Sequence, residues 1–82
     1  MEPEDVGFYR GLADQVVQQR SNRQLSQAEL ADLSGTTQSA IARFEAAKRP
    51  PKIDTLLRIA NALDCELEIN FRPRTNTRKE ST

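Results

Sequence analysis

Four polar residues in one short stretch have side chains suited to contacting the edges of nucleic-acid bases. The stretch is "GTTQSAIARFE" at residues 35–45, and the four residues are Thr37, Gln38, Ser39 and Arg43. On a helical wheel of about 100° per residue, the last three share one side with two alanines, whereas Ile41 and Phe44 lie opposite. Gln and Arg make bidentate hydrogen bonds to base edges, and small alanines let a helix approach a surface closely. A solvated helix face is the alternative interpretation.

Charge is distributed unevenly along a chain whose formal net charge is zero. Residues 20–52 carry six basic and three acidic side chains, net +3, and residues 72–82 carry four basic and one acidic, again net +3. Residues 1–19 and 53–71 each carry four acidic side chains and one basic, net −3. A basic segment attracts a polyanion even when the total charge is zero. An ordinary charged surface explains the same distribution.

The composition argues against most enzymes and metalloproteins. The chain has no histidine, so the commonest general base and the commonest metal ligand are missing. The single cysteine, Cys65, has no second cysteine for a disulfide or a zinc site, and the three glycines form no phosphate-binding loop. We therefore predict no enzymatic activity, no cofactor and no metal site.

The length of 82 residues corresponds to one small domain. A core of that size is marginal, so contact with a partner surface is expected to add stability. The acidic start has no apolar stretch of the signal-peptide type, and no apolar run is long enough to span a membrane. A lone cysteine suits a reducing compartment. We therefore predict a cytoplasmic protein without a membrane partner.

Apolar spacing predicts two helices in the first half of the chain. Residues 1–5 are predicted to be disordered, and residues 6–21 repeat apolar side chains at intervals of three and four. Ser26 and Glu29 have the spacing of a capping box at the start of the second helix. Gly35 is suited to end that helix in a left-handed conformation.

Two further helices are expected before the pattern changes. Thr36 and Thr37 are both candidate caps for the third helix, which ends before the diproline at Pro50 and Pro51. A fourth helix fits residues 53–63. Its expected apolar stripe consists of Ile53, Leu56, Leu57, Ala60 and Leu63.

Apolar and polar residues alternate over residues 65–72, which predicts a β-strand that ends at Pro73. A single strand leaves its backbone N–H and C=O groups unpaired, and the same strand of a second copy, antiparallel across a two-fold axis, is the simplest partner. We therefore predict a homodimer, with a short fifth helix as the alternative. Residues 73–82 are predicted to be a disordered basic tail. The strand residues expected in the dimer interface are Leu67, Ile69 and Phe71.

The stretch "LSQAELADLSGTTQSAIARFE", followed by "TLLRIANAL", resembles the helix-turn-helix of the Cro/repressor (Xre) family. Ala31, Gly35 and Ile41 fall where that family has a small residue, a turn glycine and a buried branched residue. The resemblance covers about residues 8–63 and implies a DNA-binding transcriptional repressor. After Leu63 the strand instead resembles the antitoxins of the HipB type, which repress their own operons and bind a toxin.

The resemblance also implies roles for individual residues. Gln27 matches a phosphate-contacting position at the start of the second helix, where free backbone amides favour an anion; an exposed residue in a first helical turn is the alternative. The base-facing positions of the recognition helix correspond to Thr37, Gln38, Ser39 and Arg43. An ion pair between the first and third helices corresponds to Arg20 and Glu45. The remaining candidates for phosphate contacts, beside the diproline loop, are Lys48, Arg49 and Lys52. Plain solubilising charge is the alternative for these three residues.

Three features depart from the family pattern. Many members have a glycine near Ala46 and Ala47, so alanine there is expected to lengthen the third helix and to move Lys48. Ser34 replaces a residue in the turn that is commonly apolar. Phe44 is bulkier than the usual aliphatic residue. All three changes affect the surroundings of the predicted contact residues rather than the residues themselves.

These patterns together predict a mostly α fold, a four-helix repressor-like helix-turn-helix domain over residues 6–72 with one C-terminal strand at residues 65–72 that is paired across a homodimer. The predicted function is binding of a double-stranded DNA operator and transcriptional repression, as an autoregulating antitoxin with a cognate toxin. A phage or prophage repressor is the alternative within that class. A protein-interaction module that has lost DNA binding is the alternative from another class.

Overall fold

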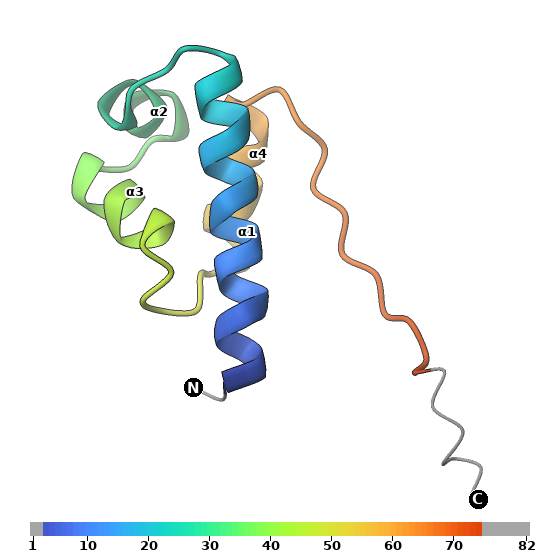
Figure 1. The fold of residues 1–82 in the computed structure, drawn as a ribbon. Helices are drawn as coiled ribbons and strands as arrows, with labels where there is room; N and C mark the ends of the chain where they lie inside the picture. Colours follow the sequence, from blue (N-terminus) through green and yellow to red (C-terminus); the bar gives the residue numbers. More distant parts are fainter. Residues whose placement is uncertain (1–2, 75–82) are drawn as a thin grey trace, which may run out of the picture.

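The computed structural model describes residues 3–74 and contains four helices followed by a C-terminal segment (Figure 1). In Figure 1, α2 and α3 lie on one side of α1, α4 lies behind it, and the C-terminal segment runs down the other side. This arrangement confirms the predicted four-helix, mostly α fold. The helices are α1 (Pro3–Asn22), α2 (Gln27–Ser34), α3 (Gln38–Glu45) and α4 (Ile53–Ala62).

The first helix begins at Pro3, whereas the sequence predicted a helix from residue 6. Proline is favoured in the first turn of a helix because its missing N–H has no intrahelical partner there. Residues 1–2 of the predicted disordered start and residues 75–82 of the predicted tail lie outside the described residues. No helix within residues 3–74 is both long and apolar enough to cross a membrane.

Side-chain caps and one glycine set the ends of α2 and the start of α3. Ser26 Oγ accepts from the Glu29 N–H at 3.0 Å, and the Ser26 N–H donates to Glu29 Oε1 at 2.7 Å, which confirms the capping box. Gly35 follows α2 with a φ of 71°, the left-handed conformation that glycine adopts at least cost. Thr37 caps α3, because its Oγ1 accepts from the Ala40 N–H at 3.1 Å.

One hydrophobic core holds the four helices together. It lies between α2, α3 and α4, and Leu12 and Val16 of α1 pack against it. Full burial of a leucine or isoleucine side chain contributes about 1.5–3 kcal/mol, so this cluster is the main source of stability. Its buried members are Leu30, Ala31, Ile41, Phe44, Leu56, Ile59 and Leu63.

The buried face of α4 is rotated from the predicted stripe. Ile53 and Leu57, both expected to face inward, are about half exposed, whereas Ile59 is buried. Positions 56, 59 and 63 follow the three- and four-residue spacing of one helix face, which leaves Ile53 and Leu57 at its edge. The prediction was wrong for these two residues because several apolar faces compete on a helix this rich in leucine and isoleucine.

Residues 65–74, here called the C-terminal arm, follow an elongated path and are not a strand in the single chain (Figure 1). The predicted strand at residues 65–72 is therefore absent from the described residues of one chain. A strand requires a hydrogen-bonded neighbour, and none lies beside the arm within residues 3–74. Leu67 packs against the core, whereas Phe71 is 98% exposed. Pairing of the arm across a homodimer remains a prediction.

Non-glycine residues in the left-handed region follow three of the helices. Gln24 follows α1 with a φ of 58°, Ala47 follows α3 with a φ of 56°, and Asp64 follows α4 with a φ of 55°. The expected lengthening of α3 is therefore wrong: α3 ends at Glu45, and Ala47 turns the chain instead of continuing the helix. The buried side chain of Ala47 offsets part of the backbone strain.

We predict opposite stability changes for two substitutions at left-handed positions. Gly35→Ala should destabilise the domain by about 1 kcal/mol, because a left-handed alanine is strained even though an added Cβ meets no atom within 4 Å. Gln24→Gly should stabilise it by a similar amount, because it relieves strain at an exposed position. Urea denaturation measures both changes. Gly11→Ala, inside α1 and also free of contacts, is the control and should stabilise the domain. If Gly35→Ala and Gly11→Ala changed the free energy of unfolding in the same direction, the explanation by backbone strain at Gly35 would be wrong.

Candidate nucleic-acid interface

The predicted base-facing residues lie together on the outer side of α3. Gln38, Ser39 and Arg43 are exposed, while Ile41 and Phe44 on the opposite side are buried in the core. The helix therefore presents one polar side outward and is attached by its apolar side. The structure agrees with the helical-wheel prediction for these residues, and their contacts with bases remain predictions.

Thr37 has a structural role in addition to its predicted one. It lies just before α3, is exposed, and accepts the Ala40 N–H through Oγ1. The hydroxyl proton of Thr37 is therefore the group left to donate to a ligand. The two alanines on this side, Ala42 and Ala46, add little bulk between the polar residues, so a flat or grooved surface can approach the backbone of α3 closely.

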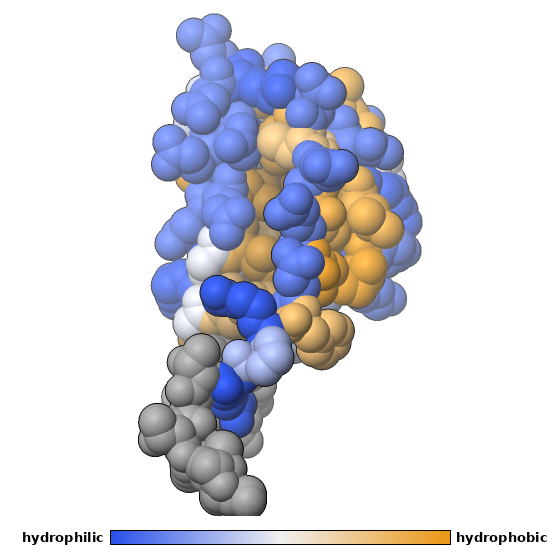
Figure 2. Space-filling view, turned by 90° about the vertical axis from the view of Figure 1, so that its right-hand side faces the viewer, coloured by the Kyte–Doolittle hydropathy of each residue, from blue (hydrophilic) through white to orange (hydrophobic). Residues whose placement is uncertain are grey.

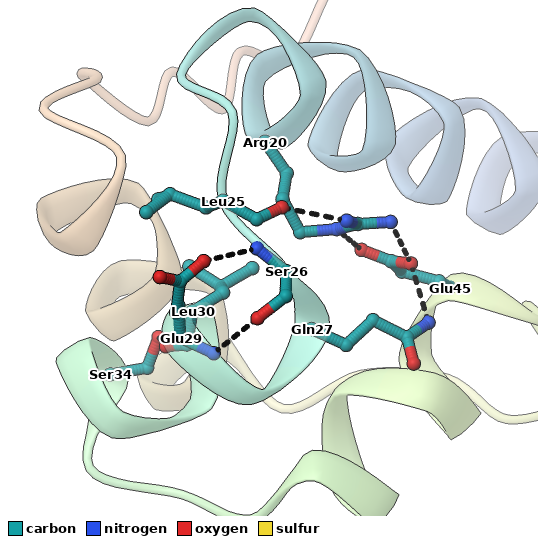
Figure 3. Close-up of polar contacts among 8 residues, drawn as sticks. All are labelled: Arg20, Leu25, Ser26, Gln27, Glu29, Leu30, Ser34 and Glu45. Carbon is teal, nitrogen blue, oxygen red and sulfur yellow. Dashed lines mark hydrogen bonds and ion pairs between the residues drawn. The ribbon is translucent and has the colours of Figure 1, made fainter.

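An ion pair attaches the end of α3 to the end of α1 (Figure 3). Arg20 Nε donates to Glu45 Oε2 at 2.7 Å, and Arg20 Nη2 donates to Glu45 Oε1 at 3.0 Å. A third bond, from Arg20 Nη1 to the Leu25 carbonyl oxygen at 2.9 Å, fixes the guanidinium against the loop between α1 and α2. The pair that the family resemblance implied is therefore confirmed.

Burial and hydrogen bonding both act on this pair. The side chains are 17% exposed for Arg20 and 7% for Glu45. The hydrogen bonds to Glu45 raise the pKa of Arg20 above its ordinary value, and the charge of the carboxylate adds to this effect, whereas burial opposes it. Arg20 therefore carries its charge throughout the accessible pH range, and the carboxylate beside it always has a cationic partner.

Gln27 belongs to the same network, which sequence reasoning missed. Its Nε2 donates to Glu45 Oε1 at 2.9 Å, so one carboxylate joins α1, α2 and α3 (Figure 3). The side chain is half-buried, and one of its amide N–H groups is already used. The second amide N–H stays available to donate to a phosphate in the predicted contact, whereas Oε1 can only accept. No sequence signal reveals this bond, because the partners are 18 residues apart on separate helices.

The loop between α3 and α4 presents the remaining predicted phosphate contacts. Lys48, Arg49 and Lys52 are all exposed, and none of them pairs with a described acidic side chain. Arg58, in contrast, pairs with Asp54 at 3.3 Å on α4. The loop therefore carries three cations whose charge is available to a polyanion.

The serine in the turn is accommodated by one hydrogen bond. Ser34 is buried, and its Oγ donates to the Leu30 carbonyl oxygen at 2.6 Å. A buried hydroxyl costs little when it is paired, so serine replaces the commonly apolar residue without disrupting the turn. Arg58 also reaches the turn, where its Nη1 donates to the Gly35 carbonyl oxygen at 3.5 Å.

Two short helices joined by a glycine turn, with the second helix anchored inside and polar outside, define the helix-turn-helix class of DNA-binding transcription regulators. The chain belongs to the helix-turn-helix family, whose model matches residues 18–70. Proteins of this class bind DNA and are regulators rather than enzymes. The similarity to the Xre family that was stated from the sequence is thereby confirmed.

Named relatives support the same class. Antitoxin HigA1 from two strains of Mycobacterium tuberculosis, CDC 1551 and H37Rv, is in each case 39% identical over 66 residues. The match covers 80% of this chain and 44% of each relative, so the chain spans less than half the length of these relatives. The crystal structure of the restriction-modification controller protein C.AhdI from Aeromonas hydrophila is similar, with a TM-score of 0.71 and 30% identity over 74% of this chain and 88% of that chain.

We predict that loss of Glu45 destabilises the domain more than loss of an exposed carboxylate. Glu45→Ala leaves the largely buried Arg20 without its partner and should cost about 3 kcal/mol, measured by urea denaturation. Asp54→Ala breaks an exposed pair and should cost at most about 1 kcal/mol. The double variant Arg20→Met/Glu45→Met removes both charges and should be more stable than Glu45→Ala. Equal effects of Glu45→Ala and Asp54→Ala would show that the network does not hold α3.

Proposed function

We propose that the chain is a sequence-specific transcriptional repressor that inserts the outer side of α3 into the major groove of its operator. The observation that carries this proposal is the division of α3 into an anchored side and a free polar side. Ile41 and Phe44 are buried and Glu45 is bound to Arg20, while Gln38 and Arg43 are exposed. A rigid helix that exposes Gln and Arg satisfies the geometry of direct base recognition.

Each contact residue has a distinct proposed role. Gln38 and Arg43 make bidentate contacts to base edges, and the hydroxyls of Thr37 and Ser39 add single hydrogen bonds. Gln27, fixed by Glu45, directs its second amide N–H at a phosphate beside the N-terminus of α2. The three loop cations attract the backbone without reading sequence. These cations are Lys48, Arg49 and Lys52.

The regulator is proposed to be an autoregulating antitoxin. Support comes from two relatives that are named antitoxins and are 39% identical to this chain. The proposed partner in that case is a cognate toxin. The alternative of a phage or prophage repressor uses the same operator contacts. A toxin-like reading frame beside the gene would favour the antitoxin, and phage genes would favour the repressor.

A protein-interaction module without DNA binding is the competing class. The observation in its favour is the net charge of −3 on each of residues 1–19 and 53–71, which flank the basic segment. The dependence of duplex affinity on salt separates the two, because displaced counterions make DNA affinity fall steeply with salt. The exposed, unpaired cations beside α3 favour the DNA-binding function.

The repressor is proposed to act as a two-fold homodimer joined through the C-terminal arm. The arm exposes Ile69 and Phe71, and beyond Cys65 its backbone makes no hydrogen bond within the described part of one chain. A second copy supplies both a neighbouring strand and apolar cover. Two recognition helices in one dimer then read two half-sites of the same operator.

We predict that two residues of α3 determine the preferred DNA sequence. Selection from a random duplex pool should yield a pseudo-palindrome with half-site centres about one helical turn, or a multiple, apart. Gln38→Ala or Arg43→Ala should weaken binding to the selected duplex by about 1–3 kcal/mol and change random duplex binding less. Arg49→Ala is the matched control for Arg43→Ala, and it should weaken binding to the selected and the random duplex about equally. If both α3 variants bind the selected duplex like wild type, the proposed recognition surface is wrong.

We predict that the arm is required for dimerisation. A chain that stops after Asp64 should be monomeric in sedimentation equilibrium and should bind the selected duplex much more weakly, because one helix then reads one half-site. Circular dichroism should show retained helix, since the buried cluster lies within residues 30–63. A stable dimer of this truncated chain would place the interface on the helices.

A further inference from the structure

An open groove of about 1070 Å³ lies between the arm and the helices. Its helical side includes Phe8, Leu12 and Ile53. Figure 2 views this side of the molecule and shows apolar surface beside hydrophilic residues. The groove lies on the opposite side of α1 from α3 (Figure 1), so an occupant would not block the proposed DNA-binding side. The arm contributes Leu67, Ile69 and Phe71 to the lining.

The apolar residues of this groove are exposed, as in a binding interface. Phe8 is 63% exposed and Phe71 is 98% exposed, and Ile53 and Ile69 are more than half exposed. Contiguous apolar surface of this kind on a small protein indicates a binding site. Beyond Cys65, whose N–H donates to the Ala60 carbonyl oxygen at 2.8 Å, the backbone of the arm makes no hydrogen bond within the described residues. These free backbone groups indicate that the occupant includes an extended segment.

The sequence of the arm is complementary to itself when it is reversed. With Ile69 facing its own copy, Leu67 lies opposite Phe71, and Glu66 lies opposite Arg72. Every apolar residue of this stretch then faces an apolar residue, and each Glu66 faces a cation. Cross-strand pairs of both kinds stabilise antiparallel strands.

We propose that the occupant is the arm of a second copy, paired antiparallel with Ile69 on the two-fold axis. This inference rests on the proposed homodimer and specifies its register and its docking surface. The apolar sides of both arms face the helices, as Leu67 already does in one chain. The two arms then lie about 4.8 Å apart, the usual spacing of paired strands. Phe71 of each copy lies beside Leu67 of the other and covers the groove of that other copy.

Other registers are less favourable. A shift by one residue places every apolar side chain opposite a polar one and turns one arm away from the helices. A register with Glu68 on the axis sets two like charges against each other. A register with Asn70 on the axis replaces the Glu66–Arg72 pair by Glu68–Arg72. It places Leu67 opposite Pro73, so Leu67 loses its aromatic partner.

The position of Pro73 fits the proposed register. Proline has no N–H to donate, so it belongs at a pair without ladder hydrogen bonds. Pairs alternate along an antiparallel ladder, so the pairs of Ile69 with itself, Leu67 with Phe71, and Cys65 with Pro73 are of one type. If that type is the non-hydrogen-bonded one, Pro73 is accommodated and the apolar side chains approach each other most closely.

A charge exchange tests the register. Arg72→Glu sets Glu against Glu66 twice in each dimer and should raise the dimer dissociation constant about tenfold in sedimentation experiments at low salt. Glu66→Arg/Arg72→Glu should restore wild-type dimerisation. The matched control Glu68→Arg/Arg72→Glu has the same net charge and should not. If only the control double variant restored dimerisation, residue 68 would lie opposite residue 72. Asn70 would then lie on the axis, and the proposed register would be wrong.

Disulfide trapping supplies a second measurement. In a Cys65→Ser background, Ile69→Cys should form an inter-chain disulfide at least tenfold faster than Glu68→Cys or Asn70→Cys, because only residues on the axis face their own copies within disulfide range. Faster trapping at either neighbour would overturn the register. A dimer that is insensitive to every charge variant and traps none of the cysteines would overturn the arm interface alone. A monomeric wild-type chain would overturn the proposed homodimer as well. The proposed DNA-binding role of α3 would then be tested separately, by measuring binding to a duplex with a single half-site.

Discussion

The carboxylate of Glu45 is the point at which three helices are joined, and the orientation of α3 depends on it. Arg20 approaches from α1 and Gln27 from α2, and both donate to the same side chain. A largely buried carboxylate is tolerated only with such partners, and its loss would leave Arg20 unpaired. Because α3 must keep its outer side free for a ligand, it has to be fixed from its inner side and its end. Burial of Ile41 and Phe44 stabilises the packing of α3 against the core, and the ion pair fixes the orientation of the helix.

The two sides of α1 therefore have different chemistry. On the α3 side, exposed Gln, Ser and Arg side chains and a loop of three cations face outward. On the arm side, half-exposed apolar residues are accompanied by Glu66 and Glu68. The zero net charge of the chain, the sum of 12 basic and 12 acidic side chains, therefore does not describe either side. A polyanion is attracted to one side, while the other side is suited to a self-complementary strand. The proposed DNA binding and the proposed dimerisation use different sides of the molecule, and a dimer would add cover that the small core of one chain lacks.

Local chemistry made much of the fold predictable from the sequence. The capping box at Ser26 and the left-handed Gly35 depend on residues a few positions apart, and both were confirmed. The ion pair was predictable only through the family resemblance. The bond from Gln27 to Glu45 depends on tertiary packing, and nothing in its spacing indicates it. The conformation of Ala47 was mispredicted because alanine normally favours continuing a helix. The predicted strand at residues 65–72 is absent from one chain, because the described residues contain no second strand for it to pair with.

The central claim is that the outer side of α3, held by Glu45, is the surface that contacts DNA. The most direct test is a titration of the isotope-labelled protein with its selected duplex, followed by amide chemical shifts in NMR spectra. We predict the largest shift changes at residues 37–43 and at the start of α2, near Gln27. Smaller changes are expected in the loop that carries Arg49, and little change is expected in the arm. Large changes confined to the arm and α1, with residues 37–43 unaffected, would contradict the account.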